Sequence, residues 1–114
     1  MLSASIGLRY TQGDSIELKF AVTDENGETA NITGDSIEFV IADESGPVIT
    51  TADGSAEATI TNPSGGLFTV TVAAEYTEQL LGTYRYQARL TDLSGNVATV
   101  ARGFITFVRS LIVG

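Results

Sequence analysis

The fold is decided by the stretch Gly82-Thr83-Tyr84-Arg85-Tyr86-Gln87-Ala88-Arg89-Leu90-Thr91. Its apolar and polar residues alternate with a period of two, which is the repeat of a β-strand with one buried and one wet face. The inward residues of this strand are Tyr84, Tyr86, Ala88 and Leu90, and the outward residues are Arg85, Gln87 and Arg89. The stretch therefore predicts a strand that packs one face against a second layer.

Three further segments repeat this alternation, at residues 15–22, 35–43 and 67–73. Their inward residues are Ile16, Leu18, Phe20 and Val22, then Ile37, Phe39 and Ile41, then Phe68, Val70 and Val72. Glycine-containing polar clusters separate the segments, and no stretch shows a sustained helical period. The sequence predicts an all-β protein, an antiparallel β-sandwich of seven or eight strands.

The first and last segments are less regular. Residues 5–9 are short enough to form an edge strand. Residues 97–108 are too long for one strand of constant alternation, so we expect a bulge at Arg102-Gly103, after which Ile105 and Phe107 face the core. Residues 74–79 break the alternation and predict one helical turn.

Gly82, Tyr84 and Tyr86 stand at alternate positions. This arrangement resembles the tyrosine corner of immunoglobulin-like sandwiches, in which a tyrosine hydroxyl bonds to upstream backbone two residues before the second core cysteine. Tyr86 then takes the place of that cysteine, Leu18 or Phe20 lies opposite it, and Phe39 takes the place of the core tryptophan. The alternative is a strand in which two tyrosines alternate without such a contact.

Composition limits the domain organisation and the chemistry. With 114 residues the chain is one domain, with a core at about 4–108 and an apolar C-terminal tail at 109–114. The absence of Cys and His excludes disulfides, zinc sites of the usual ligand types and a Ser–His–Asp triad. A net charge of −8 argues against nucleic acid or an anionic membrane as the main partner. No apolar run approaches the roughly 20 residues of a membrane span, and no signal peptide opens the chain.

Acidic pairs are the only candidate acid–base groups. They occur at Asp24-Glu25, at Asp43-Glu44, and at Glu75 with Glu78. They fall in exposed turns of a domain too small for a deep cleft, so we expect no enzymatic activity and no cofactor. Calcium could bind among residues 24–28, but their spacing departs from the helix–loop–helix calcium pattern, and Asn26-Gly27 is typical of a tight hairpin with positive φ angles. Tyr10 and Tyr76 are the candidate exposed aromatics for glycan binding.

The charges are unevenly distributed along the chain. Eleven of the fourteen acids lie in residues 1–57, whereas four of the six bases lie in residues 58–114. In an immunoglobulin-like order, the strands at 35–43, 83–91 and 97–108 share a sheet, which places Glu38 on one outer face with Arg85, Arg89 and Arg102. Arginine is enriched at interfaces, so we predict that this face binds a partner. The alternative is a solvated face with weak cross-strand ion pairs.

The C-terminal tail contains Leu111, Ile112 and Val113, although chain termini are usually polar. Apolar termini are normally held by packing, within the domain or against a neighbour, and we expect a neighbour here.

Several short motifs follow one another in a fixed order. They are Gln12-Gly13-Asp14, Ile32-Thr33-Gly34, Asn62-Pro63, Gly66-Leu67-Phe68-Thr69-Val70 and Gly82-Thr83-Tyr84-Arg85-Tyr86, and then Asp92 with Gly95 and Gly103 with Ile105. In this order they resemble a family of small immunoglobulin-like domains of tailed bacteriophages, similar to the N-terminal domain of the phage baseplate upper protein. The resemblance runs from about Leu8 to Phe107.

The resemblance implies a non-enzymatic structural protein of the virion, made in the host cytoplasm. Its partners would be other virion structural proteins and copies of itself, with no nucleic acid, membrane or small-molecule substrate. The baseplate protein continues into receptor-binding parts and this sequence does not, so we expect a decorating or joining protein on the head, neck or tail. The alternatives are a baseplate adaptor that anchors receptor-binding parts, or a stand-alone module that binds surfaces through glycan or calcium.

Overall fold

The computed structural model describes residues 8–111, which form eight strands and one short helix. The elements in chain order are β1 (Leu8–Thr11), β2 (Ile16–Ala21), β3 (Ser36–Asp43), β4 (Gly46–Thr50), β5 (Ala56–Asn62), β6 (Leu67–Val72), α1 (Ala74–Thr77), β7 (Gly82–Thr91) and β8 (Val97–Val108). The helix is the single turn that the broken alternation predicts.

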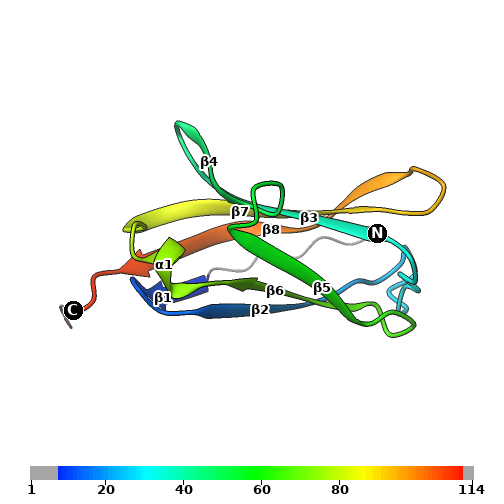
Figure 1. The fold of residues 1–114 in the computed structure, drawn as a ribbon. Helices are drawn as coiled ribbons and strands as arrows, with labels where there is room; N and C mark the ends of the chain where they lie inside the picture. The colour runs from blue at the N-terminus through cyan, green and yellow to red at the C-terminus, as the bar shows by residue number, and fades with distance from the viewer. Residues whose placement is uncertain (1–7, 112–114) are drawn as a thin grey trace.

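The strands form two layers, which Figure 1 shows nearly edge-on. One sheet has the order β1-β8-β7-β3-β4 and the other has the order β2-β6-β5. Neighbouring strands pair antiparallel, except that β1 runs parallel to β8. The prediction of an immunoglobulin-like β-sandwich is confirmed, and β3, β7 and β8 share a sheet as expected.

Aromatic side chains fill the space between the sheets. The Phe20 ring from the smaller sheet stacks on Phe68 at 5.0 Å between ring centroids, and it lies 6.3 Å from both Phe39 and Tyr86 of the larger sheet. Phe39 and Tyr86 are 6.2 Å apart. Phe20 therefore meets Tyr86 across the core, where an inter-sheet disulfide would otherwise connect the two layers.

The Tyr84 hydroxyl accepts a hydrogen bond of 3.1 Å from the backbone N–H of Leu81. This is the contact to upstream backbone that a tyrosine corner makes. The Tyr84 ring packs edge-on against Phe107 with centroids 5.9 Å apart. Gly82, between the two bonded residues, has a φ of 100°, which is a left-handed backbone conformation that favours glycine. The corner therefore fixes the entry of β7 into the sheet.

Two predictions about the first and last strands need correction. The first strand, β1, continues to Thr11 instead of ending at Arg9, and it occupies a sheet edge as predicted; residues 5–7 of the predicted strand lie outside the described residues. The bulge in β8 lies at Val100 rather than at Arg102-Gly103, because Ala88 pairs with Ala101 whereas Arg89 pairs with Thr99. Val100 and Ala101 are consequently both buried, and the changed alternation then turns Ile105 and Phe107 inward as predicted.

Two loops at one end of the sandwich, at residues 24–28 and 92–96, share one conformation. In each, the aspartate N–H donates to the carbonyl four residues later, and the glycine N–H donates back to the aspartate carbonyl. Each aspartate carboxylate also accepts two backbone N–H groups within its loop. The prediction of positive φ at both Asn26 and Gly27 is wrong, since only Gly27 adopts it, at 78°.

Candidate docking surface

The outward side chains of β1, β3, β7 and β8 share one surface of the larger sheet. Arg85 pairs with Phe104, Gln87 pairs with Arg102, and Glu38 pairs with Arg89 across neighbouring strands. We call this surface the arginine face and define it by Arg9, Glu38, Arg85, Gln87, Arg89, Arg102 and Phe104. Each of these side chains is exposed.

The arginines of this face differ in their partners. Arg89 Nη2 lies 2.9 Å from Glu38 Oε1, which confirms that the two share a face and makes Arg89 one half of an ion pair. Within residues 8–111, neither Arg85 nor Arg102 forms an ion pair. An exposed ion pair like that of Arg89 with Glu38 contributes only about 0–1 kcal/mol to stability. The charge on Arg85 and Arg102 is therefore the part of the predicted site that remains open to a partner.

Three residues of the arginine face, Arg9, Gln87 and Phe104, were not among the predicted site residues. Arg9 pairs with Thr106 because β1 lies parallel to β8, and this partner lies too far along the chain for a local pattern to predict it. Phe104 is 57% exposed, which is unusual for so large an apolar side chain. The sequence could have predicted the exposure of Phe104, because a strand that turns Ile105 and Phe107 inward turns Phe104 outward.

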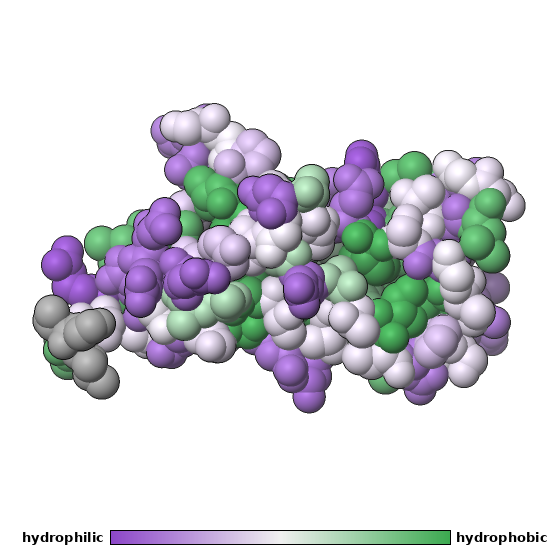
Figure 2. Space-filling model, viewed as in Figure 1, coloured by the Kyte–Doolittle hydropathy of each residue, from purple (hydrophilic) through white to green (hydrophobic). Residues whose placement is uncertain are grey.

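A shallow groove crosses the arginine face beside the β3–β4 hairpin. Its lining includes Val40 and Ala42 of β3, Arg85 and Gln87 of β7, and Arg102 and Phe104 of β8. The hairpin stands out from the body of the molecule, as Figures 1 and 2 show. Asp43 and Glu44 at its tip border the end of the groove next to Arg85. The groove thus combines cationic and apolar contacts with one acidic border.

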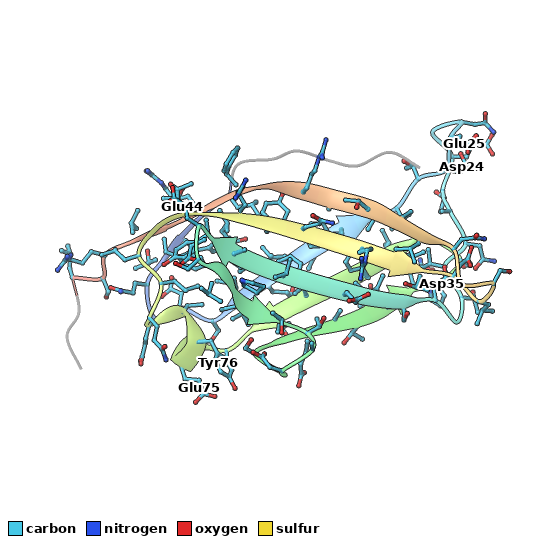
Figure 3. All side chains as sticks on the ribbon, turned by 90° about the horizontal axis from the view of Figure 1, so that it is seen from above. Asp24, Glu25, Asp35, Glu44, Glu75 and Tyr76 are labelled. Atoms are coloured by element: carbon cyan, nitrogen blue, oxygen red, sulfur yellow. The ribbon has the colours of Figure 1, made fainter. Side chains whose placement is uncertain are left out.

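The acidic candidates do not converge on one site. Figure 3 shows Asp24 and Glu25 on one projecting loop, Glu44 on the β3–β4 hairpin, and Glu75 with Tyr76 on the helix. Within the described part of the chain, no three Asp, Glu, His or Cys residues are placed to hold a metal ion. The Asp24 Oδ1 atom accepts hydrogen bonds from the N–H groups of Asn26 at 2.9 Å and Glu28 at 3.0 Å. Asp24 therefore organises its own turn.

Among residues 8–111, three aspartate carboxyl groups have shifted pKa values. Desolvation, followed by repulsion from Asp92, raises the pKa of Asp35. Hydrogen bonds from the backbone and side chain of Asn96 hold the pKa of Asp92 below its ordinary value. Hydrogen bonds from the Ser55 side chain and backbone do the same for the pKa of Asp53. Each shift arises from loop structure rather than from a cleft.

The two candidate glycan-binding tyrosines lie in different environments. Tyr10 is half-buried and packs on Phe107 with ring centroids 6.4 Å apart, so the prediction that it is exposed is wrong; this burial raises the pKa of its hydroxyl. Tyr76 is exposed and lines a hollow at one end of the smaller sheet together with Glu17, Glu57 and Glu75.

Of the predicted tail contacts, Leu111 is described and is 97% exposed. Leu111 therefore does not pack within the domain, which was one of the two ways in which an apolar tail could be held. Ile112 and Val113 lie outside the described residues. The structure also has, over residues 8–111, no helix of the length and apolarity that a membrane crossing needs.

Comparison with known proteins supports the fold. No protein-family model matches the chain, and no curated protein matches it. A similar solved structure is that of CopC from Methylosinus trichosporium OB3b, with a TM-score of 0.54 and 14% sequence identity over 96% of this chain and 91% of that chain. At this identity the likeness concerns the fold alone.

Proposed function

We propose that the chain is a non-enzymatic structural protein of a tailed-phage virion, a small decorating or joining protein that docks through the arginine face. The ordered motifs that resemble phage immunoglobulin-like domains support the virion assignment. The arginine face supports docking, because it concentrates positive charge on a domain whose net charge is −8.

The observation that carries this proposal is the exposure of Phe104 between Arg85 and Arg102. Arg85 lies opposite Phe104, while Arg102 lies two residues before it on the same strand and face. Arginine and aromatic residues dominate the binding energy of protein interfaces when a partner shields them from water. A site with one apolar side chain between two cations suits a partner that is acidic at its rim and apolar at its centre.

The test is incorporation into virions of the double variant Arg85→Glu/Arg102→Glu. We expect the wild-type protein to co-purify with virions at a fixed copy number and the variant to be lost from them. The matched control is Lys19→Glu/Arg109→Glu, which changes the net charge by the same amount at exposed positions outside the face. Absence of the wild-type protein from virions would overturn the proposal, and immunogold labelling would separate head, neck, tail and baseplate locations.

The same preparation tests the alternative of a surface-binding module. The exposed Tyr76 beside Glu17, Glu57 and Glu75 is the feature of this structure that such a module would use. Retention on a polysaccharide column that Tyr76→Ala abolishes, or a calcium-dependent rise in the melting temperature, would favour the module over the virion protein.

A further inference from the structure

The end of the sandwich that carries the two aspartate-capped loops is strongly acidic. We call it the acidic end and define it by Asp24, Glu25, Glu28, Asp35 and Asp92. No Lys or Arg occurs in residues 20–37 or 90–101, which contain these loops. Both loops lie at the same end of the long axis of the molecule, at the right in Figure 1, and Figure 3 shows the loop of Asp24 and Glu25 projecting apart from Asp35.

The acidic end also has an exposed apolar side chain. Leu93, at the tip of the 92–96 loop, is 79% exposed. The backbone hydrogen bonds and aspartate caps of both loops hold Glu25 and Leu93 on well-defined turns. Because these loops are already ordered, binding through them requires little further loss of conformational freedom.

The acidic end thus matches the arginine face in chemistry. The face contains four arginines against the single carboxylate of Glu38, with Phe104 exposed among them. The end contains five acids, no base and the exposed Leu93. A two-fold contact of two arginine faces would place arginines against arginines, which like-charge repulsion disfavours. A contact between the end of one copy and the face of another pairs opposite charges.

The net charge of −8 on each copy opposes association, but only over short distances. Charges are screened within about 8 Å at physiological ionic strength. The molecule is 45 Å long, so most like-charged groups of two copies lie beyond that range when one end meets one face. Whether two copies attract or repel each other therefore depends on the charges at the contact itself.

We infer that the arginine face receives the acidic end of a second copy of this chain, an inference that rests on the docking role proposed for that face. Glu25 and Glu28 would approach Arg85 and Arg102, and Leu93 would approach Phe104. Asp43 and Glu44 border the groove at its hairpin end, so the second copy enters from the side of β8. The interface is head-to-tail, so in a pair the copy whose end is bound keeps a free face, and the copy whose face is bound keeps a free end.

The experiment uses two variants that each lose one half of the interface. Arg85→Glu/Arg102→Glu reverses the face, and Glu25→Lys/Glu28→Lys reverses the end without touching the capping carboxylates of Asp24 and Asp92. The controls, with equal charge changes elsewhere, are Lys19→Glu/Arg109→Glu and Glu75→Lys/Glu78→Lys. Circular dichroism and thermal melting establish that every variant is folded. Sedimentation velocity over a concentration series measures association of the purified proteins.

We expect the wild type and both controls to associate with rising concentration, and each reversed variant to associate at least about tenfold more weakly. An equimolar mixture of the two reversed variants should associate again, because the native end of one meets the native face of the other. The weaker association of Glu25→Lys/Glu28→Lys distinguishes a head-to-tail contact from a symmetric contact of two arginine faces, which reversal of the acidic end would leave intact. A wild type that stays monomeric, or association that is insensitive to Glu25→Lys/Glu28→Lys, overturns the inference.

Failure of this inference and failure of the proposed function give different results. If the purified protein stays monomeric but face reversal still removes it from virions, the face docks a different virion protein and the head-to-tail inference is wrong. If the purified protein assembles head-to-tail but never accompanies virions, the inference holds and the virion assignment is wrong.

Discussion

At the scale of single residues, a few polar side chains bond to the backbone and shape the turns that the sheets require. Tyr84 accepts from Leu81, and Asp24 and Asp92 each accept two N–H groups of their own loop. Side chains of this kind supply hydrogen-bond partners to backbone groups that no neighbouring strand reaches. These contacts therefore hold each turn in one conformation.

The tyrosine corner gives the first prediction. Tyr84→Phe removes the hydroxyl that accepts from Leu81 while it keeps the ring against Phe107. We expect the free energy of unfolding to fall by about 1 kcal/mol, the usual net value of one hydrogen bond, in equilibrium chemical denaturation. Tyr76→Phe is the control, since Tyr76 is exposed on the helix. Equal effects of the two substitutions would show that the corner contributes nothing.

Shifted carboxyl pKa values give a second prediction, with two opposite signs. The pKa of Asp35 is raised in the folded state, so its charge disfavours folding at neutral pH, and this penalty disappears below the pKa of the unfolded chain, about 3.9. Asp35→Asn should therefore raise the free energy of unfolding at pH 7 and leave it unchanged at low pH.

Asp53 provides the opposite case. Its pKa is lowered in the folded state, so it stabilises the fold above about pH 3.9, and that contribution is lost as the pH falls through the folded value. Asp53→Asn should lower the free energy of unfolding at pH 7 but not at low pH. Denaturation curves of both variants at several pH values check the signs, and shifts in the same direction for both would contradict this account.

At the scale of elements, alternation predicted the faces of most strands but not their irregularities. β2, β3, β6 and β7 each have one buried and one wet face, because the alternation of their residues is unbroken. The bulge at Val100 escaped prediction because Val100 and the adjacent Ala101 are both apolar, so either alternation fits the local sequence. Gly103 drew the prediction instead, but it is regularly paired with Tyr86.

The candidate site was predictable to the same extent. Arg85, Arg89 and Arg102 were predicted to face outward on one sheet, and each is exposed there. Which of them has an ionic partner was not predictable, because the pairing of Arg89 with Glu38 depends on the register between β3 and β7. Arg9 joins the face only through a parallel pairing of the two ends of the described chain, which leaves no local pattern in the sequence.

The turn into β6 gives a prediction at this scale. Gly66 has a φ of 68°, and a Cβ there would lie 2.6 Å from the carbonyl oxygen of Val22 and 2.7 Å from that of Ala30. Gly66→Ala therefore adds a backbone collision to the strain of the left-handed conformation, and we expect a loss of at least about 3 kcal/mol in free energy of unfolding. Because β6 lies between β2 and β5, this collision would weaken the whole smaller sheet.

The matched control is Gly27→Ala. Gly27 has a similar φ of 78°, but no atom lies within 4 Å of its added Cβ. It should lose only about 1–2 kcal/mol, the cost of the left-handed conformation alone. Urea denaturation of the two variants measures the difference. Equal losses in the free energy of unfolding would mean that the backbone around Gly66 shifts to accommodate the methyl group at no energetic cost.

At the scale of the whole molecule, the sandwich is closed by rings rather than by a covalent link. Phe20, Phe39, Phe68 and Tyr86 join the two sheets at the position that a disulfide occupies in antibody domains. Aromatic pairs contribute about 0.5–1.5 kcal/mol beyond their buried area, so four contacting rings are a substantial part of the stability of a small domain.

Two phenylalanines of the larger sheet test the division between core and surface. Phe39 is 1% exposed in the core, whereas Phe104 is 57% exposed on the arginine face. Phe39→Ala should lower the free energy of unfolding by about 3–5 kcal/mol, and Phe104→Ala should leave it nearly unchanged. Thermal melts followed by circular dichroism measure both, and the account fails if Phe104→Ala is the more destabilising.

Phe104→Ala should also reduce docking, which separates its role from that of Phe39. Incorporation into virions and self-association of the purified protein both measure this loss. A Phe104→Ala variant that melts like the wild type and docks like the wild type would remove Phe104 from the interface.

The parallel pairing of β1 with β8 determines how the domain responds to mechanical load. Leu8 pairs with Ile105 and Thr11 pairs with Val108, so the chain enters this ladder at one end and leaves it at the other. A force that pulls the two termini apart acts along both strands, and all the backbone hydrogen bonds between β1 and β8 share it. If the two strands were antiparallel, the same force would break their hydrogen bonds one after another. Tension that reaches the domain through its termini is thus resisted in shear by the whole ladder.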